Sequence, residues 1–274
     1  MTTTPPMALT VAGSDPSGGA GIQADLKTFT ALGVYGASVI TALTAQNTRG
    51  VTGIVKLETD FIRAQFDAVT SDLAISAMKT GMLADAATVT TVASLIKGWS
   101  KGPVVVDPVM VATSGDVLLE PDAIEAVRRR LLPLATVITP NLPEAATLLG
   151  CPIANGERDL IEQGRALLSF GCKAVLIKGG HGRSAEAVDY LVTANGTQRF
   201  AAARIATRNT HGTGCTLSAA IAAGLAKGHA MTDAVATAKD FVTNALISGA
   251  ELAVGGGNGP IDHLYGISSR GAKT

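Results

Sequence analysis

Two glycines in the stretch Gly212-Thr213-Gly214-Cys215 precede an alanine-rich segment that has the pattern of a buried helix. Glycines let the backbone curl so that successive N–H groups point at one spot, and a helix N-terminus adds the positive end of its dipole. Such a turn can stabilise the negative charge on a phosphoryl group during its transfer. Taken alone, the turn is more typical of a tight entry into a packed helix, so the anion-site interpretation needs support from other residues.

Cys215 follows the second glycine, and a helix N-terminus lowers the pKa of a thiol. We therefore expect Cys215 to be reactive, as a nucleophile or as a proton acceptor. Cys151 and Cys172 are predicted to be small apolar fillers. Three cysteines without paired spacing and four scattered histidines indicate neither a disulfide framework nor a zinc site, which favours a reducing compartment.

Carboxylate and amide side chains occur where two apolar runs end. Asp107 closes the run Val104-Val105-Val106, and a charged residue ending a buried strand is rarely there for packing. Asn141 and Glu144 begin a helix-like segment, where they could serve as a helix cap and a favourable first-turn charge. An amide and a carboxylate in this place could equally organise Mg²⁺, which proteins hold largely through water and substrate phosphate. Both interpretations remain open at the level of sequence.

The composition narrows the class of protein. The chain is 47% hydrophobic and only 4% aromatic, and its formal net charge is zero, so nothing favours nucleic acid or an anionic membrane as a partner. Histidine, glycine, threonine and serine interrupt the uncharged stretch 210–226, which favours a buried helix over a membrane span. Residues 1–6 show no secretory signal pattern, and we expect a cytoplasmic protein.

The elements that must position these residues alternate between short β-branched runs and helical patterns. This alternation predicts an α/β fold with parallel βαβ units and helices on both faces of the sheet. Two short runs around Asn195-Gly196 predict a hairpin, and three mostly helical stretches follow it: 215–227, 232–248 and the C-terminal tail. We expect one domain over residues 1–274, with loose tails at residues 1–7 and 265–274. Expected strands are 9–12, 38–43, 75–79, 104–107, 137–139 and 175–178, and expected helices are 20–32, 59–71, 86–96, 121–131, 142–149 and 161–170.

Polar residues and glycines gather directly after the expected strands. Every strand needs a turn after it, but ligands bind beyond the carboxyl ends of strands in open parallel sheets, so six such groups predict one shared cleft. The groups are Gly13-Ser14-Asp15, Gln46-Asn47, Gly81-Met82, Asp107, Asn141 and Lys178-Gly179-Gly180.

Two common nucleotide-binding motifs are absent from the sequence. The loop after Gly13 lacks Gly-x-Gly-x-x-Gly spacing, and no Gly-x-x-x-x-Gly-Lys-Ser/Thr occurs, which argues against a nicotinamide dehydrogenase and against a P-loop kinase. The loop better suits a close backbone approach to a small substrate.

With these motifs in place, the chain resembles bacterial hydroxymethylpyrimidine and phosphomethylpyrimidine kinases. The similarity runs from about residue 9 to residue 260 in one order and without large insertions. It is carried by the stretches at residues 12–25, 41–48, 79–83, 139–144 and 209–215.

The resemblance implies a ribokinase-like fold and an ATP-dependent, magnesium-dependent activity. The substrate would be 4-amino-5-hydroxymethyl-2-methylpyrimidine and then its monophosphate, and the diphosphate would feed thiamine synthesis. Related kinases often form homodimers, so we expect a homodimer here.

The resemblance also assigns roles to individual residues. Gln46 would hydrogen-bond the aminopyrimidine, because its amide offers both a donor and an acceptor. The other expected roles are pocket lining by Gly13, Ala20, Met82 and Val109, a substrate-side contact from Asp25, phosphate neutralisation by Lys178, nucleotide binding by Asn141, Thr210 and His211, magnesium binding by Asp107 and Glu144, and an anion hole at Gly212, Thr213 and Gly214 beside the proton acceptor Cys215.

One position departs from the wider ribokinase superfamily, in which the residue after the last glycine is usually an aspartate that acts as a base. A cysteine here is consistent with pyrimidine kinases and with some pyridoxal kinases. We hypothesise that a mostly neutral thiol avoids repelling a substrate that already carries a phosphate. Pyridoxal kinase remains the rival enzyme, and a vitamin- or nucleotide-binding regulator without catalysis is the rival from another class.

Overall fold

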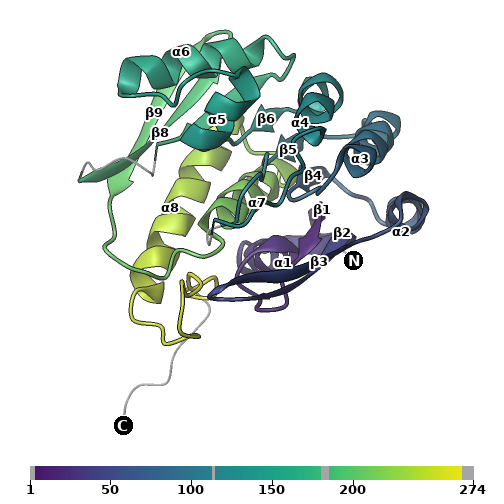
Figure 1. Ribbon diagram of the computed structural model, residues 1–274, viewed down its shortest axis with the longest axis horizontal. Helices are drawn as coiled ribbons and strands as arrows, with labels where there is room; N and C mark the ends of the chain where they lie inside the picture. Colours follow the sequence, from purple (N-terminus) through teal and green to yellow (C-terminus); the bar gives the residue numbers. More distant parts are fainter. Residues whose placement is uncertain (1–3, 113–114, 180–184, 267–274) are drawn as a thin grey trace.

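The computed structural model of the protein describes residues 4–112, 115–179 and 185–266. Its centre is a nine-stranded sheet in the order β3-β2-β1-β4-β5-β6-β7-β8-β9 (Figure 1). The six strands from β2 to β7 in this order run parallel, whereas β3, β8 and β9 are antiparallel to their neighbours. The strands are β1 (Met7–Ser14), β2 (Tyr35–Asn47), β3 (Gly50–Lys56), β4 (Ala77–Thr80), β5 (Val104–Val106), β6 (Val137–Ile138), β7 (Ala174–Lys178), β8 (Glu186–Thr193) and β9 (Gly196–Ala203).

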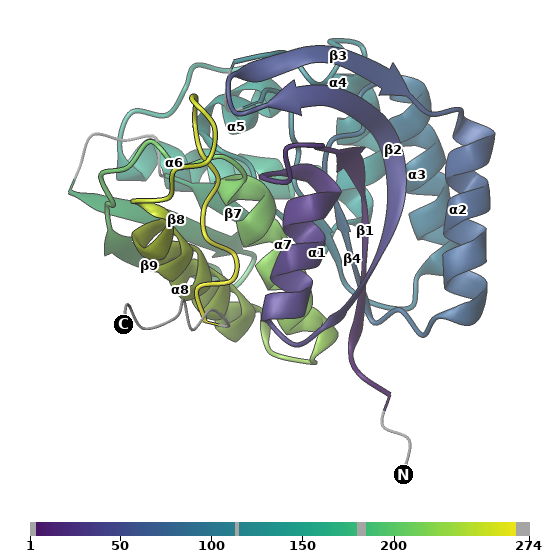
Figure 2. The same cartoon turned by 90° about the horizontal axis from the view of Figure 1, so that it is seen from below.

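Helices cover both faces of this sheet (Figure 2). Residues from α2 to α6 belong to one buried apolar cluster, and residues from α1, α7 and α8 belong to a second. The helices are α1 (Gly21–Ala31), α2 (Thr59–Asp72), α3 (Ala86–Trp99), α4 (Ala123–Ala126), α5 (Leu142–Leu149), α6 (Glu157–Leu168), α7 (Thr213–Ala226) and α8 (Met231–Gly249).

The parallel strands supply side chains to both clusters in alternation. Val104 and Val106 of β5 pack into the first cluster, and Val105 between them packs into the second. Successive side chains of a strand point to opposite faces, so a run that is apolar at every position forms a strand buried on both sides. This pattern explains why short β-branched runs identified the parallel strands, and the three-layer α/β fold predicted from the sequence is confirmed.

The strand register brings the carboxyl ends of four central strands level with one another. Val11 pairs with Thr80, Thr80 with Val106, and Val106 with Ile138. Residues one or two places further along each strand therefore emerge at the same edge of the sheet. This edge is where the sequence predicted a shared cleft.

The expectations about the elements need correction at five points. β3 was not predicted, and β2 is longer than the expected strand 38–43. The expected helix 121–131 is a short α-helix, α4, that continues as a π-helical turn (Val127–Leu131) and a 3₁₀ turn (Leu132–Leu134). The C-terminal tail was expected to be mostly helical, but no helix follows α8 among the described residues up to 266. Met7 already belongs to β1 rather than to a loose tail, while residues 1–3 and 267–274 lie outside the described part of the chain.

The segment after α8, residues 250–263, runs across the edge of the sheet without regular structure. The backbone amide of Asn258 donates to the Thr48 carbonyl at the tip of the β2–β3 hairpin. At the next residue, the Gly259 carbonyl accepts from the backbone amide of His211, and further on the His263 ring hydrogen-bonds Thr216 of α7 at 2.9 Å. The segment therefore ties the hairpin to the start of α7.

Candidate active site

One large cavity of about 670 Å³ lies at the carboxyl edge of the parallel strands. Its volume falls within the range of small-molecule sites. All but one of the residues predicted to form the site line it: Gly13, Ala20, Gln46, Met82, Asp107, Val109, Asn141, Glu144, Lys178, Thr210, His211, Gly212, Thr213, Gly214 and Cys215. The six groups of residues that follow the strands therefore converge, with Gly180 of the last group outside the described residues.

Gln46 lies near the end of β2, at the hairpin side of the cavity. The Thr44 hydroxyl, two residues earlier on the same face of the strand, lies 2.9 Å from the Ser14 carbonyl oxygen and 3.1 Å from the Gln46 amide oxygen. Met82 forms a small apolar cluster with Ala42 and Ala84, and Val109 packs against that cluster. This end of the cavity thus combines an oriented amide with an apolar wall, which suits a flat, nitrogen-containing ring.

Lys178, the last residue of β7, lies between two buried carboxylates. Its ammonium nitrogen is 3.1 Å from Asp107 Oδ1 and 3.9 Å from Glu144 Oε2. Asp107 also accepts hydrogen bonds from the Thr139 hydroxyl at 3.0 Å and from the Ser218 hydroxyl at 3.1 Å. The two carboxylates therefore face one cation, Asp107 from the end of β5 and Glu144 from the first turn of α5.

Glu144 is held in place by the start of α5. Its side chain accepts from the backbone amide of Asn141 at 2.7 Å, and the Asn141 side chain accepts from the backbone amide of Glu144 at 2.9 Å. This reciprocal pair is a capping box, so the capping interpretation of Asn141 and Glu144 is correct. It does not displace the functional one, because both residues also line the cavity.

The surroundings of the two carboxylates drive their pKa values apart. Burial opposes ionisation of Asp107, but the charges of Lys178 and Lys79 outweigh it and hold the pKa of Asp107 below its ordinary value. Burial raises the pKa of Glu144 to about 7; Lys178 opposes this shift, and the Asp107 charge adds to it. Asp107 is therefore ionised at neutral pH, whereas Glu144 is close to its midpoint.

The glycine turn faces the Lys178–Asp107 pair. Gly212 caps α7 in the left-handed conformation, with φ of +80°, which few residues other than glycine adopt. A Cβ atom placed on Gly214 would lie 3.4 Å from Lys178 Nζ and 3.9 Å from Asp107 Oδ2. The first amides of a helix have no partner within the helix. The turn therefore presents N–H groups and a positive dipole end to a space that also contains a lysine, which is an arrangement suited to phosphate.

Cys215 differs from the sequence-based expectation. Burial raises the pKa of its thiol to about 11, although Lys79 and the backbone amide of Gly21 act in the opposite direction. The expected lowering by the helix N-terminus is therefore wrong for the protein without substrates, because burial outweighs it. At neutral pH the side chain is a neutral thiol.

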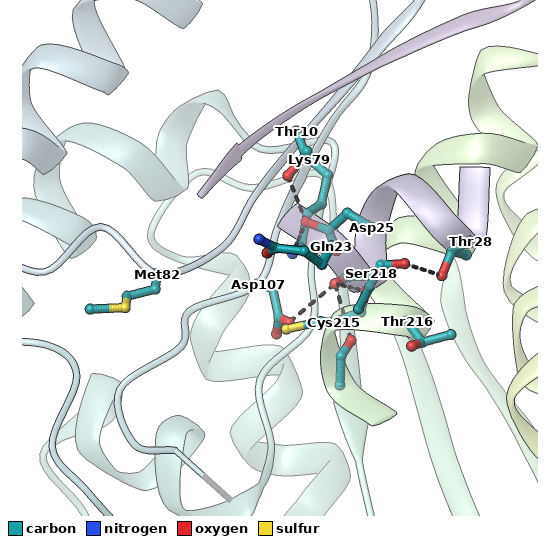
Figure 3. Close-up of polar contacts among 12 residues, drawn as sticks. Thr10, Gln23, Asp25, Thr28, Lys79, Met82, Asp107, Cys215, Thr216 and Ser218 are labelled. Carbon is teal, nitrogen blue, oxygen red and sulfur yellow. Dashed lines mark hydrogen bonds and ion pairs between the residues drawn. The ribbon is translucent and has the colours of Figure 1, made fainter. Parts of the chain in front are cut away.

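Asp25 was expected to face the substrate, but it lies behind the cavity and does not line it. Its carboxylate accepts from Lys79 Nζ at 2.9 Å and from the Thr10 hydroxyl at 2.6 Å. Figure 3 shows this group where β1, β4 and α1 meet. Asp25 and Lys79 have no exposed side-chain surface, so Asp25 connects α1 to the sheet and the prediction of a direct contact with substrate is not retained.

His211 was expected to bind the nucleotide, yet its ring already has a partner. The ring Nε2 lies 2.8 Å from the Asp15 carboxylate, and the ring is buried. The Thr213 hydroxyl likewise donates to the Thr210 carbonyl at 2.7 Å. The contacts of these side chains therefore lie within the loops that shape the site.

The sequence did not reveal the wall of the cavity formed by the β8–β9 hairpin and α8. Asp189 and Lys239 form an ion pair of 2.6 Å there, and the Gly179 amide donates to Asp189 at 3.1 Å. No local motif marks these residues, because the wall forms only where a late hairpin meets the last helix. Its lining residues are Ala187, Asp189, Ala202, Ala203, Arg204, Ile205, Lys239, Val242, Thr243 and Leu246.

The expected magnesium contact consists of the two carboxylates Asp107 and Glu144. Within the described ranges, no three His, Cys, Asp or Glu side chains come together as a metal site. The donor set nevertheless fits Mg²⁺, because both carboxylates already face one positive charge, that of Lys178, and Mg²⁺ takes few protein ligands besides water and phosphate. In the part of the chain that the structure describes, no helix is long and apolar enough to span a membrane.

Comparison with known proteins assigns the chain to a family. A family model described as phosphomethylpyrimidine kinase matches residues 15–262. The hydroxymethylpyrimidine/phosphomethylpyrimidine kinase of Escherichia coli (strain K12) is 55% identical, over 94% of this chain and 97% of that protein.

Solved structures agree with this assignment. A pyridoxal kinase of Bacillus subtilis, in an ADP complex, superposes with a TM-score of 0.89 at 39% identity and covers 96% of this chain and 98% of its own. The phosphomethylpyrimidine kinase of Clostridium difficile 630 has a TM-score of 0.78 at 44% identity and covers 88% of this chain and 99% of its own. From its sequence, its fold and its site, the chain belongs to the phosphomethylpyrimidine kinase family.

Proposed function

We propose that the protein uses ATP to phosphorylate 4-amino-5-hydroxymethyl-2-methylpyrimidine and then phosphorylates the resulting monophosphate to the diphosphate, as a step of thiamine biosynthesis. One observation carries the proposal: the glycine turn and Lys178 lie next to each other in the same cavity that Gln46 and Met82 also line. A phosphate-binding arrangement and a ring-binding arrangement therefore share one space.

In the first reaction, the hydroxymethyl oxygen attacks the γ-phosphorus of ATP. The bond between that phosphorus and the β–γ bridging oxygen breaks, ADP leaves with that oxygen, and the hydroxyl proton is released to solvent, through Cys215 where that side chain is a thiolate. In the second reaction, a phosphate oxygen of the monophosphate is the nucleophile. The N–H groups of residues 212–215 and the Lys178 ammonium would stabilise the charge on the transferred group in both reactions.

The substrate ring would lie at the hairpin side of the cavity. Gln46 would donate to a ring nitrogen and accept from the 4-amino group, and Met82 and Val109 would contact the ring faces. Gly13 and Ala20 would allow the backbone of the β1–α1 loop to approach the substrate closely. These contacts stay predictions for mutagenesis.

The neutral thiol of Cys215 suits the second substrate. An ionised carboxylate about 4 Å from an anionic phosphate would repel it by about 4 kcal/mol at an effective dielectric constant near 20, and a thiol would not. For the alcohol substrate, Cys215 would accept a proton only as a thiolate, which its raised pKa disfavours. The neutral thiol therefore favours binding of the monophosphate in the second reaction, but it is a weak base for the alcohol in the first reaction.

The nucleotide would bind against the wall of the cavity that β8, β9 and α8 form. Ile205, Val242 and Leu246 offer apolar surface to a purine ring, and the lining continues through Thr210 and Asn141 to the glycine turn. When bound, magnesium would neutralise phosphate charge, and Asp107 and Glu144 would hold it through oxygen atoms. A cation placed there would also favour the ionised form of Glu144.

Pyridoxal phosphorylation is a second candidate activity, favoured by the close superposition on the Bacillus subtilis pyridoxal kinase. The same pocket would accept the flat ring of pyridoxal if the Gln46 amide can also hydrogen-bond the edge of that ring, whose donors and acceptors differ from those of the aminopyrimidine. A homodimer and a cytoplasmic location are further proposals that extend from the family; light scattering of the purified protein tests the first.

A coupled assay of ADP release tests the function directly. We expect turnover with the pyrimidine alcohol and with its monophosphate, a lower kcat/KM with pyridoxal, and no turnover after magnesium is chelated. If neither the pyrimidine alcohol nor its monophosphate supports ADP release, the proposal is refuted. If kcat/KM is higher with pyridoxal than with the pyrimidine alcohol, the substrate is pyridoxal and not the pyrimidine.

A further inference from the structure

The Asp15 carboxylate organises the loop between β1 and α1, residues 15–20. Its Oδ1 accepts from the Ser17 amide at 2.9 Å and from the Ser17 hydroxyl at 2.7 Å. Its Oδ2 accepts from the Gly19 amide at 3.2 Å and from the Ala20 amide at 2.8 Å. Asp15 is 2% exposed, so water does not compete for these bonds.

The fifth hydrogen bond of the Asp15 carboxylate joins it to a residue outside this loop. His211 Nε2 lies 2.8 Å from Oδ2, although the two residues are 196 positions apart. All other partners of the carboxylate are donors, and an ionised carboxylate has no hydrogen to give. His211 Nε2 must therefore carry the hydrogen and donate it to Asp15.

Around this bond, the loop and the glycine turn are in direct backbone contact. A Cβ atom on Gly212 would lie 1.8 Å from the Gly19 carbonyl oxygen, and a Cβ atom on Gly19 would lie 2.3 Å from the His211 ring. Neither glycine can carry a side chain without moving one loop away from the other. The two loops thus meet as closely as backbones allow, with the Asp15–His211 bond across the contact.

His211 is also fixed from the far side. Its backbone amide donates to the Gly259 carbonyl at 3.0 Å, and it forms an isolated bridge with Pro260. The ring is therefore directed from a restrained backbone toward Asp15. Since His211 directly precedes Gly212, any shift of the ring is passed to the first residue of the phosphate-binding turn.

We propose that Asp15 and His211 are a pair of positioning residues that holds the substrate loop (residues 15–20) at a fixed distance from the phosphoryl-transfer turn (residues 212–215). The inference rests on the proposed function, in which the first loop approaches the acceptor and the second binds the transferred group. A displacement of about 1 Å between reacting groups can lower a rate about 100-fold. His211 would act through the position of Gly212 and not by binding the nucleotide.

Two substitutions at His211 separate the hydrogen bond from the bulk of the ring. His211→Phe keeps a ring without a donor, whereas His211→Gln keeps a donor near the place of Nε2. The matched control is His229→Phe at an exposed histidine after α7. We expect His211→Phe to lower kcat about 10- to 100-fold with the pyrimidine alcohol while KM for ATP stays within about 3-fold. His211→Gln should retain at least a third of the wild-type kcat, and the control should match wild type.

Three outcomes of these kinetics would overturn the proposal. They are a change in kcat of less than 2-fold in His211→Phe, a rise in KM for ATP at unchanged kcat, and equal damage in His211→Gln and His211→Phe. The second outcome would instead support the nucleotide contact that the sequence suggested.

Gly19→Ala gives an independent test, because it forces the loops apart while Asp15 and His211 are both kept. We expect it to lower kcat to a similar extent, with an unchanged circular dichroism spectrum. Wild-type kcat in this folded variant would refute the role of the contact.

Amide hydrogen exchange decides the question without any turnover. The amides of Gly19 and Ala20 should exchange faster in His211→Phe than in wild type or His229→Phe, in the absence of substrates. If the wild type fails to phosphorylate either pyrimidine, the proposed function fails, yet this measurement still tests the pair. Unchanged protection of both amides would refute it.

Discussion

The ammonium nitrogen of Lys79 lies 2.9 Å from the Asp25 carboxylate, and neither side chain reaches the surface. Removal of one partner leaves an uncompensated buried charge, which costs about 3–5 kcal/mol, whereas replacement of both is often close to neutral. We expect Lys79→Met and Asp25→Asn each to lower the free energy of unfolding by that amount, measured in urea. The double variant should regain most of the loss. A double variant less stable than both single ones would contradict this account.

Cys215→Asp tests why a thiol follows the glycine turn. An ionised carboxylate repels a phosphorylated substrate more than an alcohol, so kcat/KM should fall about 10-fold or more further for the monophosphate than for the alcohol. Cys215→Ser is the matched control without a charge and should affect both substrates alike. Equal losses with both substrates in Cys215→Asp would show that charge is not the reason.

Gln46→Ala tests the ring-binding end of the cavity. Loss of two neutral hydrogen bonds, each of about 1 kcal/mol, should raise KM for the pyrimidine alcohol about 10- to 50-fold and leave KM for ATP unchanged. Gln198→Ala, at an exposed position of β9, serves as the control. An unaltered KM for the pyrimidine in Gln46→Ala would remove Gln46 from the pocket assignment.

Glu144 should make stability depend on pH in a defined window. Burial raises its pKa from 4.5 to about 7, so the folded protein holds this proton more tightly than the unfolded chain does. Its contribution is complete below pH 4.5 and is lost as the pH rises to about 7, by about 3 kcal/mol. Relative to wild type, Glu144→Gln should therefore gain stability across this window in urea titrations. A constant difference between Glu144→Gln and wild type across this window would mean that the pKa of Glu144 is not raised.

The convergence of the site could be predicted from the sequence because parallel strands end at one edge. Asp107, Asn141 and Lys178 each follow a β-branched run that is apolar on both faces, and the register of the strands brings these ends level. The glycine turn could be placed for a similar reason, since an alanine-rich helix directly follows it. In these cases a residue's place at the end of a strand or at the start of a helix is enough to put it at the site.

The role of Asp25 and the state of Cys215 could not be predicted, because both depend on residues distant in the sequence. Lys79, which pairs with Asp25, lies 54 positions away, and the burial that raises the pKa of Cys215 comes from the packing of α7 against the sheet and α1. β3 was missed because its side chains are mostly exposed, so the run lacks the alternation that marks a half-buried strand. Local pattern carries no information about such partners.

The irregular segment after α8 has a consequence for engineering this protein. Stretches without secondary structure usually accept inserted residues, but residues 250–263 connect Thr48, His211 and Thr216 through hydrogen bonds. A residue inserted there would prevent the segment from making its hydrogen bonds to Thr48, His211 and Thr216 at the same time. The β2–β3 hairpin and the glycine turn would then no longer be connected through this segment. A reporter peptide or a fused domain belongs instead in the exposed turn at Asn195, where β8 turns into β9 and the Asn195 amide donates to the Thr193 hydroxyl within the turn itself.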